Sequence, residues 1–423
     1  MSALRNSSKI KSLKVREILD SRGNPTLEVE LKTEAFSVLA SVPSGASKGK
    51  YEALELRDGG KRYKGKGVLK AIENVNKKIF PKIKGMDVRK QKDIDDLMAE
   101  LDGTDSKSNL GANAILSVSL AVARAGAEAE KLPLYRYIAK IAGNRSSLKI
   151  PVPCFNIING GAHAENDLDI QEFMIIPQIK DKKERFKKSL QMSSEIYHEL
   201  KKMIGRKYSG LGTNVGDEGG FAPPLRNPEE AIQLILNASK TLGYLEKIKI
   251  GLDCASSEFF KQGKYGMAIG FFTREGLLRY YQELVKKYPI LFLEDPFAEE
   301  DWQGFTEITK KLGRKIEIVG DDLLATDSKR IKEAYRKKAC NAVILKLNQI
   351  GTVSETIQSY KLAHSFGWKT IVSHRSGETC DNFISDFAVG IGSDFIKSGA
   401  PARGERVSKY NQLLRIEEQL KSF

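Results

Sequence analysis

Six side chains suited to acid–base or metal chemistry each stand at the end of a short apolar run. They are three carboxylates, two lysines and one histidine: Asp253, Glu294, Asp321, Lys346, His374 and Lys397. The spacing between successive positions fits one strand followed by one helix. Short continuous apolar runs are typical of strands buried on both faces, as in a parallel sheet. Barrels of alternating strands and helices carry their active sites at the C-terminal strand ends, so we expect the six side chains to converge there.

The three carboxylates form a candidate metal site. Asp253, Glu294 and Asp321 offer hard oxygen ligands, with no thiolate or imidazole in the set, and such ligands suit Mg²⁺. A single acid at a strand end can equally form a salt bridge, and that alternative stays open for each residue. Three carboxylates on neighbouring strand ends would repel one another without a cation, which favours the metal.

The two lysines are candidates for chemistry because lysine seldom ends a buried strand without a partner. A divalent cation and a second lysine nearby would disfavour the protonated amine of Lys346 or Lys397. Such a lysine can act as a general base near neutral pH. A structural ion pair with one of the acids is the alternative.

The segment around the histidine is a candidate anion site. His374-Arg375-Ser376-Gly377-Glu378 follows an expected strand and precedes a helical pattern that begins near Thr379. The guanidinium of Arg375 matches a phosphate, and Ser376 with the backbone N–H groups of a helix start would add donors. An ordinary strand-to-helix turn would have the same composition.

Two glycine-containing loops carry further candidates. Glu218 lies in Asn-Val-Gly-Asp-Glu-Gly-Gly, where glycines allow a tight turn and a close approach to a ligand, and it could serve as a general acid. His163 lies in Asn-Gly-Gly-Ala-His-Ala, and Glu172 follows in an expected strand. His198 and His364 fall inside helical patterns, where packing or surface roles are expected.

The elements that must position these residues divide into two groups, and the chain of 423 residues is long enough for two domains. Residues 1–145 predict an α+β cap, with antiparallel strands within 9–33, a turn at Gly-Asn-Pro, and helices at 67–80, 90–101, 110–130 and 134–142. A linker is expected at 143–147. Residues 146–423 predict an α/β barrel, with strands at 152–158 and 170–176 and helices at 182–204, 274–287, 328–338, 353–366 and 380–389.

Charge and composition argue against two classes of protein, nucleic-acid-binding proteins and membrane proteins. The net charge is +15, but the lysines are interleaved with acids, which favours a solvated surface, and no nucleic-acid partner is expected. No apolar run reaches the length of a membrane span and the N-terminal residues lack a signal-peptide core, so we expect no membrane insertion and a cytoplasmic protein. The four cysteines are far apart and are expected to be core residues: Cys154, Cys254, Cys340 and Cys380.

Taken together, these motifs resemble the enolase family. The resemblance spans about residues 9 to 418, in order and with compatible spacing. Its blocks include Asp20-Ser-Arg-Gly-Asn-Pro-Thr-Leu-Glu-Val, Tyr51-Glu-Ala-Leu-Glu-Leu-Arg-Asp, Val215-Gly-Asp-Glu-Gly-Gly, Lys249-Ile-Gly-Leu-Asp-Cys-Ala-Ser-Ser-Glu, Leu293-Glu-Asp-Pro-Phe-Ala-Glu, Leu345-Lys-Leu-Asn-Gln-Ile-Gly-Thr and Val372-Ser-His-Arg-Ser-Gly-Glu-Thr.

The resemblance implies a fold, a reaction and a cofactor. It implies a TIM-like (β/α)₈ barrel with one reversed early strand under an N-terminal α+β cap. It implies reversible, Mg²⁺-dependent dehydration of 2-phospho-D-glycerate to phosphoenolpyruvate in glycolysis and gluconeogenesis, and a homodimer or higher homo-oligomer. Two Mg²⁺ ions are implied per site, the second arriving with substrate. A lysine or histidine base that works with one or two Mg²⁺ ions is a known feature of the enolase superfamily.

The resemblance also implies residue roles. Lys346 removes the proton at C2, and Glu218 acts as the acid at the C3 hydroxyl. The first Mg²⁺ is held by Asp253, Glu294 and Asp321, and the second with help from Ser47. The implied substrate-binding set is His163, Glu172, Glu294, Asp321, His374, Arg375, Ser376 and Lys397.

Two positions depart from the family pattern. Lys48 and Ser398 stand where most enolases carry threonine. Two other functions are conceivable: a superfamily member that acts on a non-phosphorylated acid, and a basic surface that binds nucleic acid. Arg375, Ser376 and the Ser47 loop argue against the first, and the intact set of site residues makes the second at most an additional role.

Overall fold

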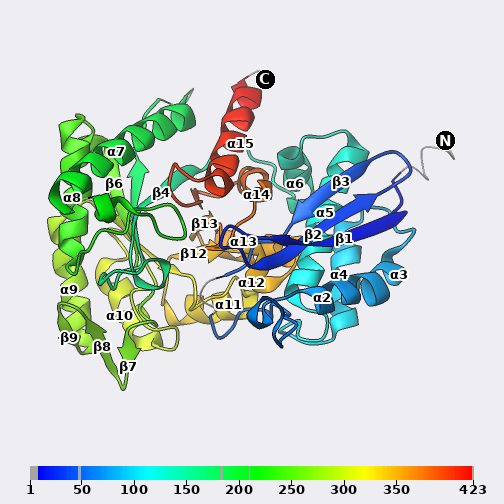
Figure 1. Cartoon of the computed structure of the whole chain (residues 1–423), viewed down its shortest axis with the longest axis horizontal. Helices are drawn as coiled ribbons and strands as arrows, with labels where there is room; N and C mark the ends of the chain where they lie inside the picture. Colours follow the sequence, from blue (N-terminus) through cyan, green and yellow to red (C-terminus); the bar gives the residue numbers. More distant parts are fainter. Residues whose placement is uncertain (1–7, 46–48, 182–183, 209, 422–423) are drawn as a thin grey trace.

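In the computed structural model, a cap with an antiparallel sheet lies beside a closed barrel. The structure describes residues 8–45, 49–181, 184–208 and 210–421. Figure 1 shows the cap in blue and cyan, the barrel in green to orange, and the C-terminal helix in red at the top of the view. This architecture confirms the predicted fold class. The division of the chain at residues 145 and 146 stays a prediction.

The cap sheet has the order β1-β2-β3, with strands Ser12–Leu19, Pro25–Lys32 and Ser37–Ser41. The carboxylate of Asp20 accepts the backbone N–H groups of Arg22 and Asn24, each at 2.9 Å. Gly23 has a φ of +73°, which glycine adopts without strain. The predicted hairpin is therefore confirmed, and its turn is held by one aspartate.

Helices pack on this sheet, and α5 is the central one. It is rich in alanine, it is buried along most of its length, and it contacts β2 and β3. Small side chains on every face let the helix pack against several neighbours at once. The cap helices are α2 (Leu69–Asn74), a π-helical turn (Val75–Ile79), α3 (Phe80–Ile83), α4 (Gln91–Asp102), α5 (Ala112–Glu130) and α6 (Leu134–Ala142).

Eight strands close the barrel in the order β10-β11-β12-β13-β14-β4-β5-β6. Only β5 runs antiparallel to its neighbours β4 and β6, and the other neighbouring pairs are parallel. The strands are β4 (Val152–Asn159), β5 (Glu172–Pro177), β6 (Ile248–Asp253), β10 (Ile290–Glu294), β11 (Glu317–Gly320), β12 (Ala342–Leu345), β13 (Lys369–Ser373) and β14 (Phe395–Lys397).

Side chains from the strands fill the barrel interior, and a larger core lies between the strands and the outer helices. The interior cluster includes Met174, Phe292, Val319, Ile344 and Ile371, all essentially inaccessible to solvent. A filled interior confines the chemistry to the barrel mouth. The outer helices are α7 (Arg185–Tyr208), α8 (Pro228–Thr241), α9 (Arg274–Lys287), α10 (Trp302–Leu312), α11 (Ser328–Lys337), α12 (Leu347–Ile350), α13 (Val353–Ser365), α14 (Phe383–Ile391) and α15 (Gly404–Lys421).

Three sequence-based expectations need correction. A small antiparallel sheet of β7 (Phe260–Lys261), β8 (Lys264–Met267) and β9 (Gly270–Phe272) interrupts the alternation after β6. Helix α14 begins at Phe383 rather than near Thr379, because the carboxylate of Asp381 accepts the Phe383 N–H at 2.8 Å and starts the helix there. Cys380 is exposed, unlike the other three cysteines, because it lies in the loop before α14.

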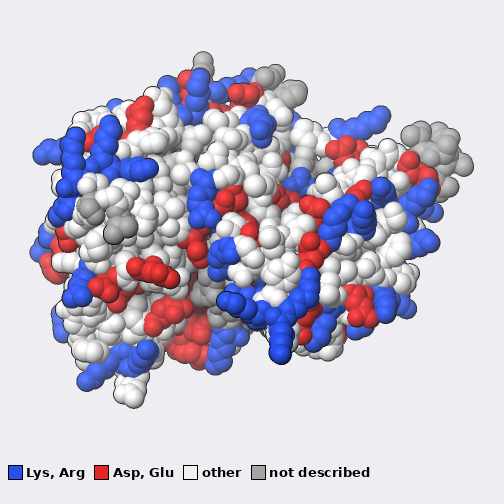
Figure 2. All heavy atoms as spheres, in the orientation of Figure 1, with Lys and Arg blue, Asp and Glu red and all other residues white. Residues whose placement is uncertain are grey.

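The surface carries both signs of charge. On the face in Figure 2, Lys and Arg are interspersed with Asp and Glu over most of the area. Within the described parts of the chain, no helix has the length and apolar character needed to cross a membrane.

Candidate active site

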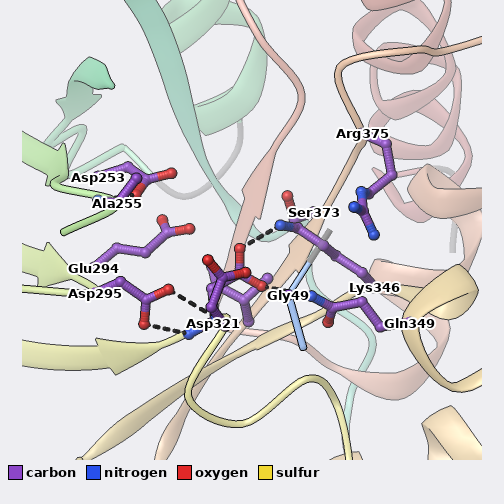
Figure 3. A network of polar contacts seen from close by, with 12 residues as sticks. Gly49, Asp253, Ala255, Glu294, Asp295, Asp321, Lys346, Gln349, Ser373 and Arg375 are labelled. Atoms are coloured by element: carbon purple, nitrogen blue, oxygen red, sulfur yellow. Dashed lines mark hydrogen bonds and ion pairs between the residues drawn. The ribbon is translucent and has the colours of Figure 1, made fainter. Parts of the chain in front are cut away.

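The predicted strand-end residues meet at one mouth of the barrel. Asp253, Glu294 and Lys397 are the last residues of β6, β10 and β14, and Asp321, Lys346 and His374 directly follow β11, β12 and β13. Asp253 is the register partner of Glu294 on one side and of Glu172 on the other. Figure 3 shows Asp253, Glu294 and Asp321 projecting from neighbouring elements toward the same space.

One cavity at this mouth collects most of the predicted site. Among the described residues, every residue predicted for the site lines it except Glu294, which accepts a hydrogen bond from the lining residue Lys397. The cavity wall is almost entirely polar, and it combines acids, bases and imidazoles from both the barrel and the cap. Its further lining residues include Glu52, Gln171, Asp295 and Asp322.

Lys397 is the centre of a buried carboxylate cluster. Its Nζ lies 2.8 Å from both carboxylate oxygens of Glu294, 3.2 Å from Asp253 Oδ2 and 3.3 Å from Glu172 Oε1. Burial alone would lower the pKa of Lys397, but the surrounding carboxylates outweigh it and raise that pKa well above its usual value. Burial and the nearby Asp253 raise the pKa of Glu294. Lys397 is therefore a permanent cation inside an acidic cluster.

Lys346 forms an ion pair with Asp321 at the next strand ends. The amide of Gln349 donates to the other carboxylate oxygen of Asp321 at 2.9 Å, and the backbone N–H of Lys346 donates to Thr326 Oγ1 at 3.0 Å. Burial alone would lower the pKa of Lys346, yet Asp321 outweighs it and the pKa is raised. The lowered pKa expected from the sequence is therefore not produced by the protein groups alone.

Two glutamates and two histidines form another wall of the cavity. Nδ1 of His163 lies 3.6 Å from Glu172 and 3.5 Å from Glu218, and Nε2 of His374 lies 3.4 Å from Glu218. Asn156 donates to Glu218 Oε2 at 3.0 Å. Burial and the like charge of Glu218 raise the pKa of Glu172 well above its usual value. This wall can therefore hold a proton on a carboxyl group at neutral pH.

Arg375 and Ser376 lie in the loop after β13. The guanidinium of Arg375 donates to both carboxylate oxygens of Glu52, at 2.8 and 3.2 Å, and to Asn348 Oδ1 at 3.1 Å. Glu52 belongs to the cap, so this pair joins cap to barrel. The hydroxyl of Ser376 lies 3.0 Å from Nε2 of His163. The predicted anion-binding residues Arg375 and Ser376 thus line the cavity, and the guanidinium of Arg375 is paired with the carboxylate of Glu52.

The carboxylate set fits Mg²⁺. Asp253, Glu294 and Asp321 are buried and offer oxygen atoms only, and a cation would share the negative charge of Asp253 and Glu294 with Lys397. The carboxylates whose potential ligand atoms lie within 4.8 Å of one another are Asp321 and its neighbours Asp295 and Asp322. Asp295 accepts the backbone N–H groups of Asp321 and Asp322, at 3.0 and 2.7 Å, and so fixes the loop that carries Asp321 (Figure 3). Burial and Asp321 raise the pKa of Asp322 to about 8.

The two departures from the family pattern differ in what the structure says of them. Ser47 and Lys48 lie outside the described residues. Ser398 follows Lys397 directly and is fully buried, with no hydrogen-bond partner for its hydroxyl among the described residues.

Sequence reasoning missed several residues of the cavity. Asp295 and Asp322 each stand beside a predicted metal ligand, and an acidic pair at a strand end is a signal that could have found them. Gln171 likewise stands directly beside a predicted site residue, Glu172. Glu52, which lies in the cap, had no usable signal because it is far from the strand ends in sequence. The same holds for Arg406 on α15, which does not line the cavity but contacts its residue His374.

Comparisons with known proteins cover nearly the whole chain. Residues 147–423 match the family model "Enolase, C-terminal TIM barrel domain", and residues 10–138 match "Enolase, N-terminal domain". The chain is 55% identical to enolase B of Dictyostelium discoideum over 427 residues, covering 98% of this chain and 96% of that protein. It is 54% identical to the enolase of Mastigamoeba balamuthi, with the same coverage, and 53% identical to that of Pyrococcus furiosus, covering 99% and 96%.

Proposed function

Since the chain belongs to the enolase family, we propose that Lys346 is the base at C2 and Glu218 the acid at the C3 hydroxyl of 2-phospho-D-glycerate. The enzyme is a hydro-lyase, a phosphopyruvate hydratase of glycolysis, which interconverts 2-phospho-D-glycerate with phosphoenolpyruvate and water. The observation that carries the residue roles is that Lys346 and Glu218 line the same buried cavity from different elements.

Removal of the C2 proton requires a neutral amine at the base. Lys346 is held at the cavity by Asp321, and this ion pair keeps its proton in place. With the charge of Asp321 shared with a bound cation, Asp321 would stabilise the protonated amine less, and burial, Arg375 and Lys397 would lower the pKa of Lys346. The C2 proton then moves to Nζ of Lys346.

Departure of the C3 hydroxyl requires a proton donor. The proton moves from Glu218 to the leaving hydroxyl, which departs as water. Glu172 and Glu218 lie with His163 in one group whose potential ligand atoms are within 4.8 Å of one another. Burial and the charge of Glu218 raise the pKa of Glu172, whereas His374 and His163 outweigh burial and lower the pKa of Glu218, so the proton of this pair rests on Glu172 and reaches the leaving hydroxyl through Glu218.

Substrate orientation falls to the residues around these two groups. We propose that Arg375 and Ser376 bind the phosphate and that Lys397, His163, His374 and Glu172 contact the substrate, beside the ligands Glu294 and Asp321. Arg375 offers a planar fork that matches phosphate oxygens, and the phosphate would exchange with or join Glu52 there. Burial excludes water from the reacting atoms.

The enolase family is Mg²⁺-dependent, and two Mg²⁺ ions per site, the second arriving with substrate, are part of the proposal. Asp253, Glu294 and Asp321 would hold the first ion, and Ser47 would help to hold the second. Bound Mg²⁺ supplies electrostatic stabilisation of the negative charge that develops on the substrate carboxylate.

The proposals about oligomeric state and cellular location rest on membership of the enolase family alone. We propose a homodimer or higher homo-oligomer in the cytoplasm. A superfamily member acting on a non-phosphorylated acid is less well supported, because Arg375 and Ser376 both face the cavity.

The test is conversion of 2-phospho-D-glycerate, followed by the ultraviolet absorbance of the enol product. The expected result is product formation that stops after exhaustive chelation and returns with Mg²⁺, and no product from the unphosphorylated acid. Full activity in the chelated enzyme would contradict the metal assignment. Equal activity on the unphosphorylated acid would contradict the phosphate assignment.

A further inference from the structure

Arg406 ties two loops of the active site together from the outer helix α15. Its side chain is fully buried. Nη1 donates to Nδ1 of His374 at 2.7 Å and to the carbonyl of Arg375 at 2.6 Å. Nη2 donates to the carbonyls of Asp217 at 2.9 Å and of Ser376 at 2.6 Å. One guanidinium thus joins the loop that carries Glu218 to the loop that carries His374.

The bond to the imidazole has a definite chemical consequence. A guanidinium only donates and stays protonated in proteins, so Nδ1 of His374 must be the acceptor. A neutral imidazole that accepts at Nδ1 carries its proton on Nε2. Nε2 of His374 lies 3.4 Å from Glu218 Oε2, so this proton faces the carboxyl group.

We propose that Arg406 is a positioning residue, which holds His374 as the neutral Nε2–H tautomer and thereby fixes the orientation of Glu218. This inference rests on the proposed role of Glu218 as the acid. Oε2 of Glu218 faces the His374 N–H and also accepts an N–H from Asn156 at 3.0 Å. An oxygen that faces two N–H groups is poorly suited to hold a proton, so the proton that Glu218 takes over from Glu172 and passes to the C3 hydroxyl is carried at Oε1.

The surroundings of His374 favour the neutral ring. The charged groups that face it are Glu218 on the 214–220 loop, Arg406 on α15 and Lys397 at the end of β14. Burial lowers the pKa of His374 to about 3, with Arg406 and Lys397 adding to the effect against Glu218. His374 is therefore a neutral ring whose Nε2 faces Glu218 at 3.4 Å without a hydrogen bond to any described residue, and it is not a proton shuttle.

The first experiment compares the wild type with Arg406→Met and Arg406→Lys, as full-length Mg²⁺-loaded enzymes. The nitrogen shifts and couplings of the His374 imidazole report which nitrogen carries the proton. We expect the Nε2–H tautomer in the wild type and its loss in Arg406→Met. We expect kcat to fall about tenfold or more in Arg406→Met with KM within about threefold, and a new ionisation on the acidic limb of the pH profile.

The lysine variant is the conservative rescue. Arg406→Lys keeps a positive donor beside Nδ1, so it should retain the tautomer and recover part of kcat. A wild-type Nδ1–H tautomer, or an Arg406→Met enzyme with the wild-type pH profile, would overturn the proposal. Since Arg406→Met leaves three carbonyls without their donor, it can fail to fold.

A second pair of variants keeps the test decisive in that case. The amide of glutamine in His374→Gln can place an N–H near the position of Nε2, whereas asparagine in His374→Asn reaches only the position of Nδ1. We expect His374→Gln to retain about tenfold more kcat than His374→Asn. Equal activities would overturn the proposal. Full turnover in Glu218→Gln would instead contradict the acid role, and the imidazole spectrum would still read out the tautomer.

Discussion

Nζ of Lys397 lies 2.8 Å from both carboxylate oxygens of Glu294, at the ends of β14 and β10. Both side chains are buried, with exposed fractions of 2% and 0%. The proposed substrate lysine is thus the counter-ion of a proposed metal ligand. Because a buried charge without a partner is costly, this pair couples the stability of the fold to the charge state of the active site.

Substitution of this lysine should destabilise the protein and increase its response to Mg²⁺. Lys397→Met leaves Glu294, Asp253 and Glu172 without their shared cation, and we expect the free energy of unfolding in chelator to fall by about 3–5 kcal/mol. Mg²⁺ then compensates more negative charge, so its stabilising increment should exceed that of the wild type. Urea unfolding with and without Mg²⁺ measures both quantities.

Lys409 provides a matched control for the lysine variant. It is a second buried lysine, paired with Glu378 at 2.8 Å, and it touches none of the proposed metal ligands among its described partners. Lys409→Met should lower stability as well, but with the wild-type Mg²⁺ increment. An equal increment in both variants would rule out the coupling between Lys397 and the metal site.

The cap residue Glu52 should compete with phosphate for Arg375. Its side chain is 8% exposed and receives both ends of the arginine fork. Glu52→Gln removes the charge that repels a phosphate there, so we expect inorganic phosphate to bind about three- to tenfold more tightly. Isothermal titration measures the affinity. Glu55→Gln, which changes a nearby glutamate paired with Arg57, should leave it unchanged; weaker phosphate binding in Glu52→Gln would instead assign Glu52 to orienting the fork.

Stability should depend on pH through Asp95, a buried residue of α4 that contacts Ser354 of α13. It accepts the N–H and hydroxyl of Ser354 at 3.0 and 2.6 Å and the amide of Gln91 at 3.0 Å. Burial raises its pKa from 3.8 to about 6. Because the folded pKa is the higher one, the folded chain gains stability as pH falls through about 6 toward 4, and at pH 8 the charged group is a cost.

Replacement of Asp95 by asparagine removes the free-energy cost of the buried charge. Asp95→Asn should increase the free energy of unfolding at pH 8, by at most about 3 kcal/mol, and the gain should vanish near pH 4. Urea midpoints at the two pH values measure the difference. Asp93→Asn, on the exposed face of the same helix, serves as the control. A gain that is the same at both pH values would contradict the raised pKa.

Much of the fold and site could be predicted from the sequence because one physical rule connects them. A strand buried on both faces is a short apolar run, and its polar end must lie at the barrel mouth, which placed Asp253, Glu294 and Lys397 correctly. The hairpin whose turn precedes Pro25 could be predicted because the hydrogen bonds that form the turn join residues close in sequence. Long-range contacts leave no such local pattern.

The parts that the sequence could not predict are contacts between distant segments. Arg375 meets Glu52 across 323 positions of sequence, and neither residue type specifies the other. The pKa of Lys346 depends on its pairing with Asp321, and the sequence showed only that both lie near strand ends. Arg406 reaches His374 from helix α15 on the outside of the barrel, and nothing in the local sequence specifies that contact.

The assignment of base and acid can be separated by one measurement, exchange of the C2 proton of 2-phospho-D-glycerate with solvent deuterium, followed by proton NMR in the presence of Mg²⁺. We expect Glu218→Gln to exchange this proton while forming little enol product, because the base is intact and the acid is absent. We expect Lys346→Ala to do neither, with rates lower by about 10³-fold or more and an intact fold by circular dichroism. Exchange at the wild-type rate in Lys346→Ala would contradict the assignment of Lys346 as the base.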